Sequence, residues 1–190
     1  MTTTKTCAID VHHHYVPEYL LEEAKKNAKH LGVELTEKDG NRSLSFAGGP
    51  PFQLHPELPA IDERLKMMAD SKLAMAALEA HTATLGYRLT GEQGENWCNV
   101  YNDGIAELVK KYPDRFVGMA SVPLQDAKRA AKVLERAVRD LNFRGGYIGT
   151  NVNGNYYNSD EFDPFWAKAQ ELDVMVVMHP EDVAGQEKMN

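Results

Sequence analysis

Short apolar runs alternate with longer amphipathic stretches along this chain. Trp97, Tyr101 and Ile105 are spaced four residues apart, which predicts a helix with one buried face. The last apolar run, VMVVM over residues 174–178, is almost unbroken, which is typical of a parallel strand buried on both faces. By the same criteria, the predicted strands are residues 6–11, 72–80, 116–122, 143–148 and 174–178.

Helices are predicted between these strands. Pro17 suits the first turn of a helix that runs to about residue 31, because proline lacks the N–H that this turn does not need. Asp126 is expected to cap the helix that follows the third strand, and residues 158–160 begin another helix. Repeated strand–helix units imply an α/β fold with a parallel sheet.

Two α/β architectures fit this order of elements. An open doubly wound sheet would be complete with five strands, whereas a (β/α)8 barrel would be only partly built. A nucleotide-binding open sheet carries a glycine-rich phosphate loop after its first strand. No such loop follows residues 6–11, which weakens the open-sheet alternative.

Residues 33–57 interrupt the alternation. The stretch VELTEKDGNRSLSF predicts a polar hairpin that turns at Asp39 and Gly40. The segment AGGPPFQLHPELP, residues 47–59, is rich in glycine and proline and is expected to be a loop. We therefore expect a single domain over residues 1–190 with an insertion at 33–57.

Composition and charge exclude several classes of function. The chain has 190 residues and a formal net charge of -7, and no lysine- or arginine-rich patch points to nucleic acid. No apolar run approaches the roughly 18 residues of a membrane span, and no signal peptide is evident. The two cysteines, Cys7 and Cys98, are too few for a disulfide framework. We expect a cytoplasmic protein in which Cys7 is a small buried residue.

The candidate chemistry begins at the end of the first strand, in the run Asp10-Val11-His12-His13-His14. Residues i and i+2 of a strand point the same way, so His12 and His14 can present two imidazoles to one ion, with His13 pointing elsewhere. Neutral imidazole is a good ligand for zinc and similar metals. The alternative is a solvated surface run or a tag remnant, which the internal position disfavours.

A third histidine, His179, follows the last apolar strand directly. The carboxyl ends of parallel strands are where α/β enzymes place function, although a capping or structural histidine is the alternative. Together with His12 and His14, it makes a plausible tripod of imidazoles from two strand ends. Asp10 is expected to orient a histidine or the local backbone rather than to bind metal.

Several stretches, taken in order, resemble one family. The sequence is similar to the amidohydrolase superfamily, and within it to the amidohydrolase-2 group, which includes aminocarboxymuconate-semialdehyde, resorcylate and salicylate-type decarboxylases. The segments IGTNVNG and HPED are most similar to the aminocarboxymuconate-semialdehyde branch. The stretches that carry the resemblance are DVHHHYVP (10–17), ERLKMMADSKL (63–73), NDGIAELVKKYPDRFVGMASVPLQD (102–126), LNFRGGYIGTNVNG (141–154) and FDPFWAKAQELDVMVVMHPED (162–182).

The resemblance implies a TIM-type (β/α)8 barrel of the metal-dependent hydrolase type. Such a barrel typically needs about 250 residues, so we expect only the first five βα units here, in a truncated domain. It implies one divalent metal ion, with Zn²⁺ expected, bound by His12 and His14 from the first strand and His179 from the fifth. The family's proton-transferring histidine and last metal-binding aspartate are expected beyond Asn190, and Asp182 is not that aspartate.

The implied activity is non-oxidative decarboxylation of an unsaturated or aromatic carboxylic acid, and the implied assembly is a homodimer. Two alternatives stay open: a metal-dependent hydrolase of a lactone, amide or ester, and a catalytically incomplete fragment. Candidate substrate contacts are Gln53 and His55 in the insertion, Asn151 and Asn153 after the fourth strand, and Arg88. The two asparagines read equally well as turn formers.

Overall fold

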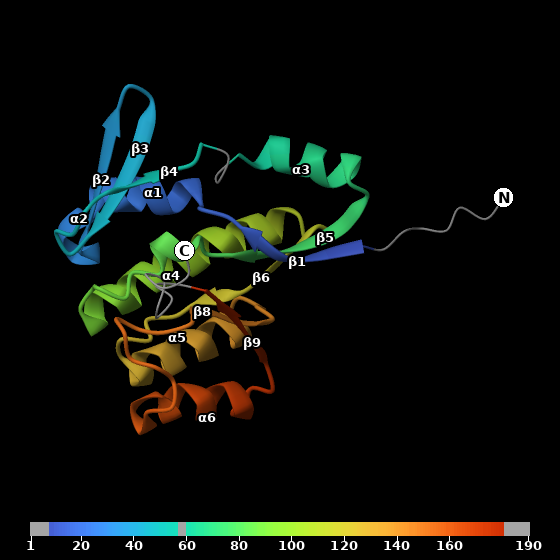
Figure 1. The fold of residues 1–190 in the computed structure, drawn as a ribbon. Coiled ribbons are helices and arrows are strands. Elements are labelled where there is room, and N and C mark those ends of the chain that lie inside the picture. The colour runs from blue at the N-terminus through green and yellow to red at the C-terminus, as the bar shows by residue number, and fades with distance from the viewer. Residues whose placement is uncertain (1–7, 57–59, 181–190) are drawn as a thin grey trace, which may run out of the picture.

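Two three-stranded parallel sheets, β1-β5-β6 and β7-β8-β9, follow each other along the chain and are joined through the short gap between β6 and β7 (Figure 1). The computed structural model describes residues 8–56 and 60–180. The strands are β1 (Ala8–His14), β5 (Leu73–Glu79), β6 (Phe116–Gly118) with β7 (Ala120–Ser121), β8 (Gly145–Gly149) and β9 (Met175–His179). Only Met119 separates β6 from β7, and its N–H still donates to the Leu78 carbonyl of β5 at 3.0 Å.

The pairing order decides between the two predicted architectures. Each strand pairs in parallel with the next one along the chain, so the order is β1, β5, β6/β7, β8, β9. A doubly wound sheet would reverse direction at an internal strand. The sequential order is that of a barrel wall, which confirms the predicted partial (β/α)8 barrel.

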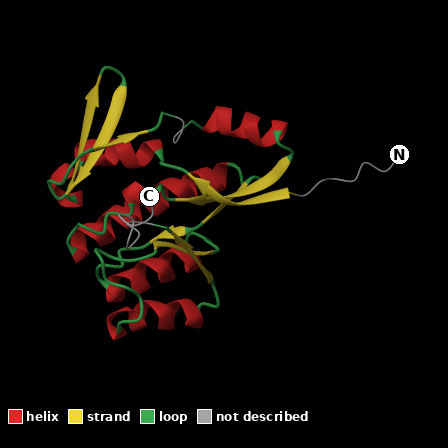
Figure 2. Cartoon of the chain, viewed as in Figure 1, coloured by secondary structure: helices red, strands yellow, loops and turns green. Residues whose placement is uncertain are grey.

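Helices connect and cover these strands (Figure 2). Helix α4 packs against β6 and β7, and α5 packs against α4, β7 and α6. Trp97, Tyr101 and Ile105 form the predicted buried face of α4, and the Asp126 carboxylate caps α5 by accepting from the Arg129 N–H at 3.2 Å. The helices are α1 (Glu18–Lys26), α2 (Ala28–Leu31), α3 (Ile61–Asp70), α4 (Gly91–Lys111), α5 (Ala127–Arg139) and α6 (Asp163–Glu171), with short 3-10 turns η1 (Thr82–Thr84) and η2 (Asp160–Phe162).

One predicted helix is divided. The helix expected from Pro17 to residue 31 is broken at Asn27, whose backbone leaves the helical region at φ -122°. The Asn27 N–H still donates to the Glu23 carbonyl at 2.8 Å, and the Asn27 side-chain amide donates to the Glu23 carboxylate at 2.7 Å, so Asn27 closes α1.

The insertion contains the predicted hairpin and one further strand. β2 (Val33–Lys38) and β3 (Asn41–Phe46) pair antiparallel across Asp39 and Gly40, which both have positive φ as a tight hairpin turn requires. The expected loop that follows includes β4 (Phe52–Leu54), which pairs with β3. In β4 the side chain of Gln53 is exposed and that of Leu54 is buried, which is the alternation of a strand with one buried face. β4 is an edge strand, where neighbouring prolines are tolerated.

The first strand ends later than predicted. The expectation was residues 6–11, but β1 spans Ala8–His14 and takes in the whole histidine run. The prediction for Cys7 lies outside the described residues. This extension matters because it fixes the alternating directions of the three histidines.

Three loops that lead from a helix to a strand share one backbone conformation. Lys72, Asn142 and Asp173 have φ values of 58°, 58° and 52°, and each lies shortly before a strand: β5, β8 and β9. This left-handed conformation is unfavourable for most side chains but is common just after a helix ends.

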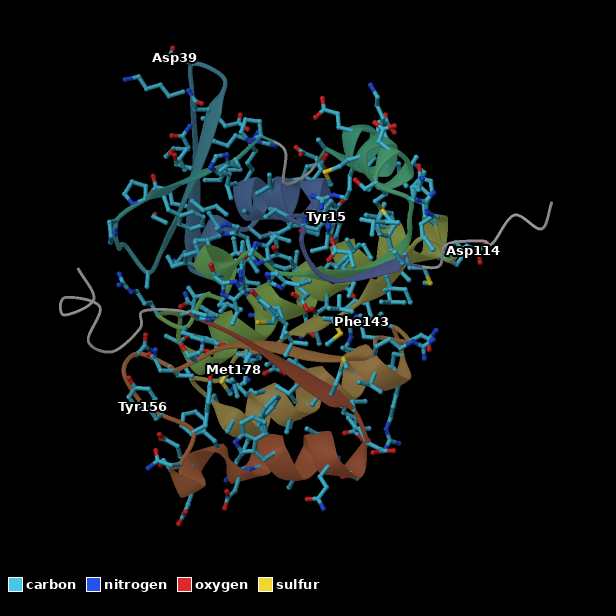
Figure 3. The ribbon with its side chains drawn as sticks, turned by 45° about the vertical axis from the view of Figure 1, so that its right-hand side comes forward. Tyr15, Asp39, Asp114, Phe143, Tyr156 and Met178 are labelled. Atoms are coloured by element: carbon cyan, nitrogen blue, oxygen red, sulfur yellow. The ribbon has the colours of Figure 1, made fainter. Side chains whose placement is uncertain are left out.

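The two outer strands expose apolar side chains. Val11 on β1 is 71% exposed, and Met175 and Met178 on β9 are 61% and 47% exposed (Met178 is labelled in Figure 3). Within the described ranges, the outer edges of β1 and β9 have no strand partner. Among those residues, no helix is both long enough and apolar enough to span a membrane.

The contact between β8 and β9 yields a test of the fold. A Cβ at Gly145 would lie 2.1 Å from the Met175 carbonyl oxygen, a backbone atom that cannot move aside. We expect Gly145→Ala to lower the free energy of unfolding by about 2–3 kcal/mol in urea denaturation. At the adjacent Gly146, a Cβ would meet Leu134 Cδ1 at 3.5 Å, so Gly146→Ala should cost less than about 1 kcal/mol. Equal losses in the two variants would contradict this pairing.

Candidate metal centre

Three imidazoles meet at the carboxyl end of the sheet. His12 and His14 come from β1 and His179 comes from β9, the two outermost strands of the sheet. One nitrogen from each ring lies within 4.8 Å of the others. The ring centroids of His12 and His179 are 5.0 Å apart, and those of His14 and His179 are 5.3 Å apart. The curvature of the sheet therefore brings together the three histidines singled out in the sequence.

The alternation along β1 explains why two of its three histidines take part. The rings of His12 and His14 are 4.6 Å apart, centroid to centroid, on one side of the strand. His13 is buried on the other side, where its Nδ1 lies 2.7 Å from an Asp10 carboxylate oxygen. The other Asp10 oxygen accepts from the His12 backbone N–H at 3.1 Å. Asp10 thus orients a histidine and the local backbone, as predicted.

A buried carboxylate fixes the orientation of His12. Glu79 ends β5, is 0% exposed, and contacts His12 Nδ1 through its Oε2. Burial raises the pKa of this carboxyl, and the contact with His12 opposes the shift. Because Nδ1 faces Glu79, His12 presents Nε2 to the cluster, which is the arrangement of carboxylate-supported metal ligands.

His14 is held in the neutral form that metal binding needs. Burial lowers its pKa to about 4, and the nearby His12, His81 and His179 add to this effect. The Tyr147 hydroxyl lies 3.2 Å from His14 Nε2. Tyr147 is fully buried in β8, so this contact comes from a rigid part of the sheet.

A fourth imidazole, His81, lies beside the cluster and was not predicted as part of it. Its ring centroid is 5.1 Å from that of His14, and its Nδ1 is buried without a hydrogen-bond partner within the described residues. Its backbone N–H donates to the Tyr101 hydroxyl at 3.2 Å, and Tyr101 in turn donates to the Tyr15 carbonyl at 2.7 Å. Tyr101 therefore ties the chain after β5 to the chain after β1.

Both missed residues, Glu79 and His81, had a signal in the sequence. They end or follow a buried apolar strand, which is the criterion that selected His179. The strand predicted over 72–80 ends within one residue of β5, but nothing in the local pattern shows that its end lies against His12 and His14.

The structure separates the two candidates from the insertion. His55 lines a cavity of about 700 Å³ together with the other histidines of this region and two charged residues of α3: His12, His13, His14, His81, Glu63 and Arg64. Gln53 does not line this cavity: it is exposed on β4, where its side-chain amide donates to Asn41 at 2.9 Å.

The two asparagines after β8 act as turn formers. Asn151 is buried, and its side-chain oxygen accepts from the Gly154 N–H at 2.9 Å. Asn153 donates to the Tyr87 carbonyl at 2.8 Å. Both residues line a separate cavity, which also includes Arg88 and contains none of the cluster histidines.

Comparison with known proteins agrees with this geometry. The family model described as amidohydrolase (Amidohydro_2) matches residues 9–189. The chain belongs to the amidohydrolase family. This match includes β1 from its second residue onward, β9 and all three histidines of the cluster.

Two curated relatives, both named as decarboxylases, match most of this chain but less than half of their own length. Over 160 residues, 80% of this chain, the sequence is 38% identical to a gamma-resorcylate decarboxylase of Rhizobium sp. (strain MTP-10005). Over 128 residues, 67% of this chain, it is 27% identical to a 2-amino-3-carboxymuconate-6-semialdehyde decarboxylase of Dictyostelium discoideum. The matches cover 48% and 36% of those proteins, so the chain spans about half, or less, of the curated relatives it matches.

A solved amidohydrolase structure agrees in fold. A dihydroxybenzoic acid decarboxylase from Polaromonas sp. JS666, solved with bound manganese and the inhibitor 2-nitroresorcinol, matches with a TM-score of 0.71 and 25% identity. The match covers 96% of this chain and 52% of that one. The described strands therefore correspond to part of a larger barrel.

The contact between Glu79 and His12 makes a prediction that needs no metal. We expect His12 to carry its proton on Nδ1 at neutral and higher pH, because the buried carboxylate accepts from that nitrogen. Long-range ¹H–¹⁵N NMR spectra of the imidazole should show this tautomer. In Glu79→Leu, the Nδ1 proton should lose its acceptor and the tautomer should change. Glu79→Gln is the control, because its amide oxygen can accept the same hydrogen bond, and loss of the tautomer in both variants would contradict the assignment.

Proposed function

We propose that this chain forms the amino-terminal part of a metal-dependent decarboxylase that acts on an aromatic or unsaturated carboxylic acid. The observation that carries the proposal is the convergence of His12, His14 and His179 at the carboxyl end of a partial barrel. The decarboxylase names of the matched relatives support the reaction type.

We propose these three histidines as ligands of one divalent metal ion. Several observations fit such an ion: the rings converge, burial favours neutral His14, and Glu79 turns Nε2 of His12 toward the cluster. The set of nitrogen donors suits zinc, which is the metal we propose. The Polaromonas structure contains manganese, and a metal-exchange measurement would separate the two ions.

The reaction would replace a carboxylate with a proton: the carbon–carbon bond breaks, CO₂ leaves, and the carbon gains a proton. A bound metal ion would supply positive charge that orients the acid and stabilises developing negative charge. The described residues position the ligands: Glu79 holds His12, and the Tyr147 hydroxyl contacts His14.

The cavity beside the cluster is suited to the proposed substrate. Its volume of about 700 Å³ falls within the usual range for small-molecule sites, about 300–1,000 Å³. His55 is at its lining and is the insertion residue that we propose as a substrate contact. A homodimer, a cytoplasmic location and the absence of nucleic-acid and membrane partners stay predictions.

The metal assignment has a direct test. Isothermal titration of the metal-free protein with Zn²⁺ should give one site, which His12→Ala and His179→Ala should weaken by at least about 100-fold, since changes around the ligands alone cost about 10–100-fold. His30→Ala is the matched control, because His30 is exposed on α2, outside the cluster. Unchanged zinc affinity in both cluster variants would overturn the assignment.

The activity is tested on the protein that carries this chain together with the rest of its barrel. When loaded with zinc or manganese, it should release CO₂ from gamma-resorcylate or from 2-amino-3-carboxymuconate semialdehyde. His179→Ala should lose this activity, whereas His30→Ala should keep it. Hydrolysis of a lactone, amide or ester without CO₂ release would instead support a hydrolase on the same scaffold.

A further inference from the structure

A second cavity lies between the insertion and the loops that follow β5 and β8. Its volume is about 230 Å³, and none of its lining residues belongs to the histidine cavity. The two cavities are nevertheless adjacent along the chain, because Thr82 lines this one and His81 lines the other. At this volume, below the usual 300–1,000 Å³ of drug-sized sites, it is suited to a small ligand.

Aromatic rings form one wall of this cavity. Phe46 on β3 and Phe52 on β4 are stacked, with centroids 6.0 Å apart and ring planes within 7°. Phe46 is buried and also packs edge-on against Trp97 of α4 at 5.2 Å, which anchors the wall to the core. Phe52 is only half-buried, so part of its surface is free to contact a flat ligand.

The charge of the cavity favours an anion. Arg88 lines it and makes no ion pair or hydrogen bond with any described residue. No aspartate or glutamate is among the lining residues in the described part of the chain, although the chain as a whole carries a net charge of -7. The planar guanidinium group is well matched to a carboxylate, with which it can form two parallel hydrogen bonds.

The walls are held in place by contacts of their own. The Asn153 side chain donates to the Tyr87 carbonyl at 2.8 Å, and the Tyr87 hydroxyl accepts from the Gly149 N–H at 3.0 Å. A Cβ at Gly49 would lie 3.3 Å from Arg88 Nη1, so the guanidinium group packs closely on the insertion backbone. The cavity therefore joins the insertion to the barrel, with the exposed Arg88 side chain at its lining.

We propose that this cavity is a binding site for a small planar aromatic carboxylate, with the ring against Phe52 and the carboxylate on Arg88. The site is separate from the metal centre and does not depend on it. It would hold a second molecule of an aromatic acid beside the histidine cavity.

The test uses a protein without a bound metal ion, so that the probe cannot bind through the metal centre. His12→Ala, treated with a chelator, is titrated with 4-fluorobenzoate and followed by ¹⁹F NMR. We expect saturable binding that Arg88→Gln weakens by at least about tenfold, the usual scale for losing a hydrogen bond to a charged group. Arg144→Gln is the matched control, because Arg144 is exposed and lies outside the cavity.

Two further measurements decide the ligand class and the location. The neutral analogue 4-fluorobenzamide should bind at least about tenfold more weakly than 4-fluorobenzoate. With Trp166→Phe in place, Trp97 is the only tryptophan, and its fluorescence should respond to 4-fluorobenzoate through the contact with Phe46. Equal affinity for both probes, or equal affinity in Arg88→Gln and Arg144→Gln, would overturn the proposal.

Discussion

The curvature of the parallel sheet is the constraint on which the candidate site depends. His12 and His179 lie on the first and last strands, separated by the whole width of the sheet, and yet their rings are 5.0 Å apart. A flat sheet of strands spaced about 4.8 Å apart could not bring them together. The two three-stranded sheets are joined at Met119: its N–H donates to the Leu78 carbonyl of β5 at 3.0 Å, and the Arg144 N–H, just before β8, donates to the Gly118 carbonyl of β6 at 2.9 Å.

The polar groups at this end of the sheet are organised by burial. Glu79 is fully buried against His12, and His14 is neutral because charging it would cost solvation and add repulsion from neighbouring imidazoles. Such a cluster is costly for folding unless each group has a partner. The Oε1 of Glu79 and the Nδ1 of His81 lack one within the described residues, which is typical of positions where a ligand or further chain supplies the contact.

The sequence was informative wherever a local pattern carried the signal. The alternation of β1 was sufficient to place His12 and His14 together, and the unbroken apolar run before His179 was sufficient to place it at a strand end. The strand predicted over 72–80 ends within one residue of β5, so the positions of Glu79 and His81 were predicted; the local pattern could not show that tertiary packing brings them against the histidine cluster. The direction of Gln53 depended on β4, an edge strand formed by tertiary pairing with β3.

The repeated left-handed residues before β5, β8 and β9 have a consequence for engineering. Asparagine and aspartate tolerate this conformation through their short polar side chains, which suits Asn142 and Asp173, whereas Lys72 has no such compensation. Replacing Lys72 with glycine would relieve backbone strain at a position outside both cavities, with a gain of up to about 1 kcal/mol. The helix-to-strand turns thus offer positions where the free energy of unfolding can be raised without changing a residue of either cavity.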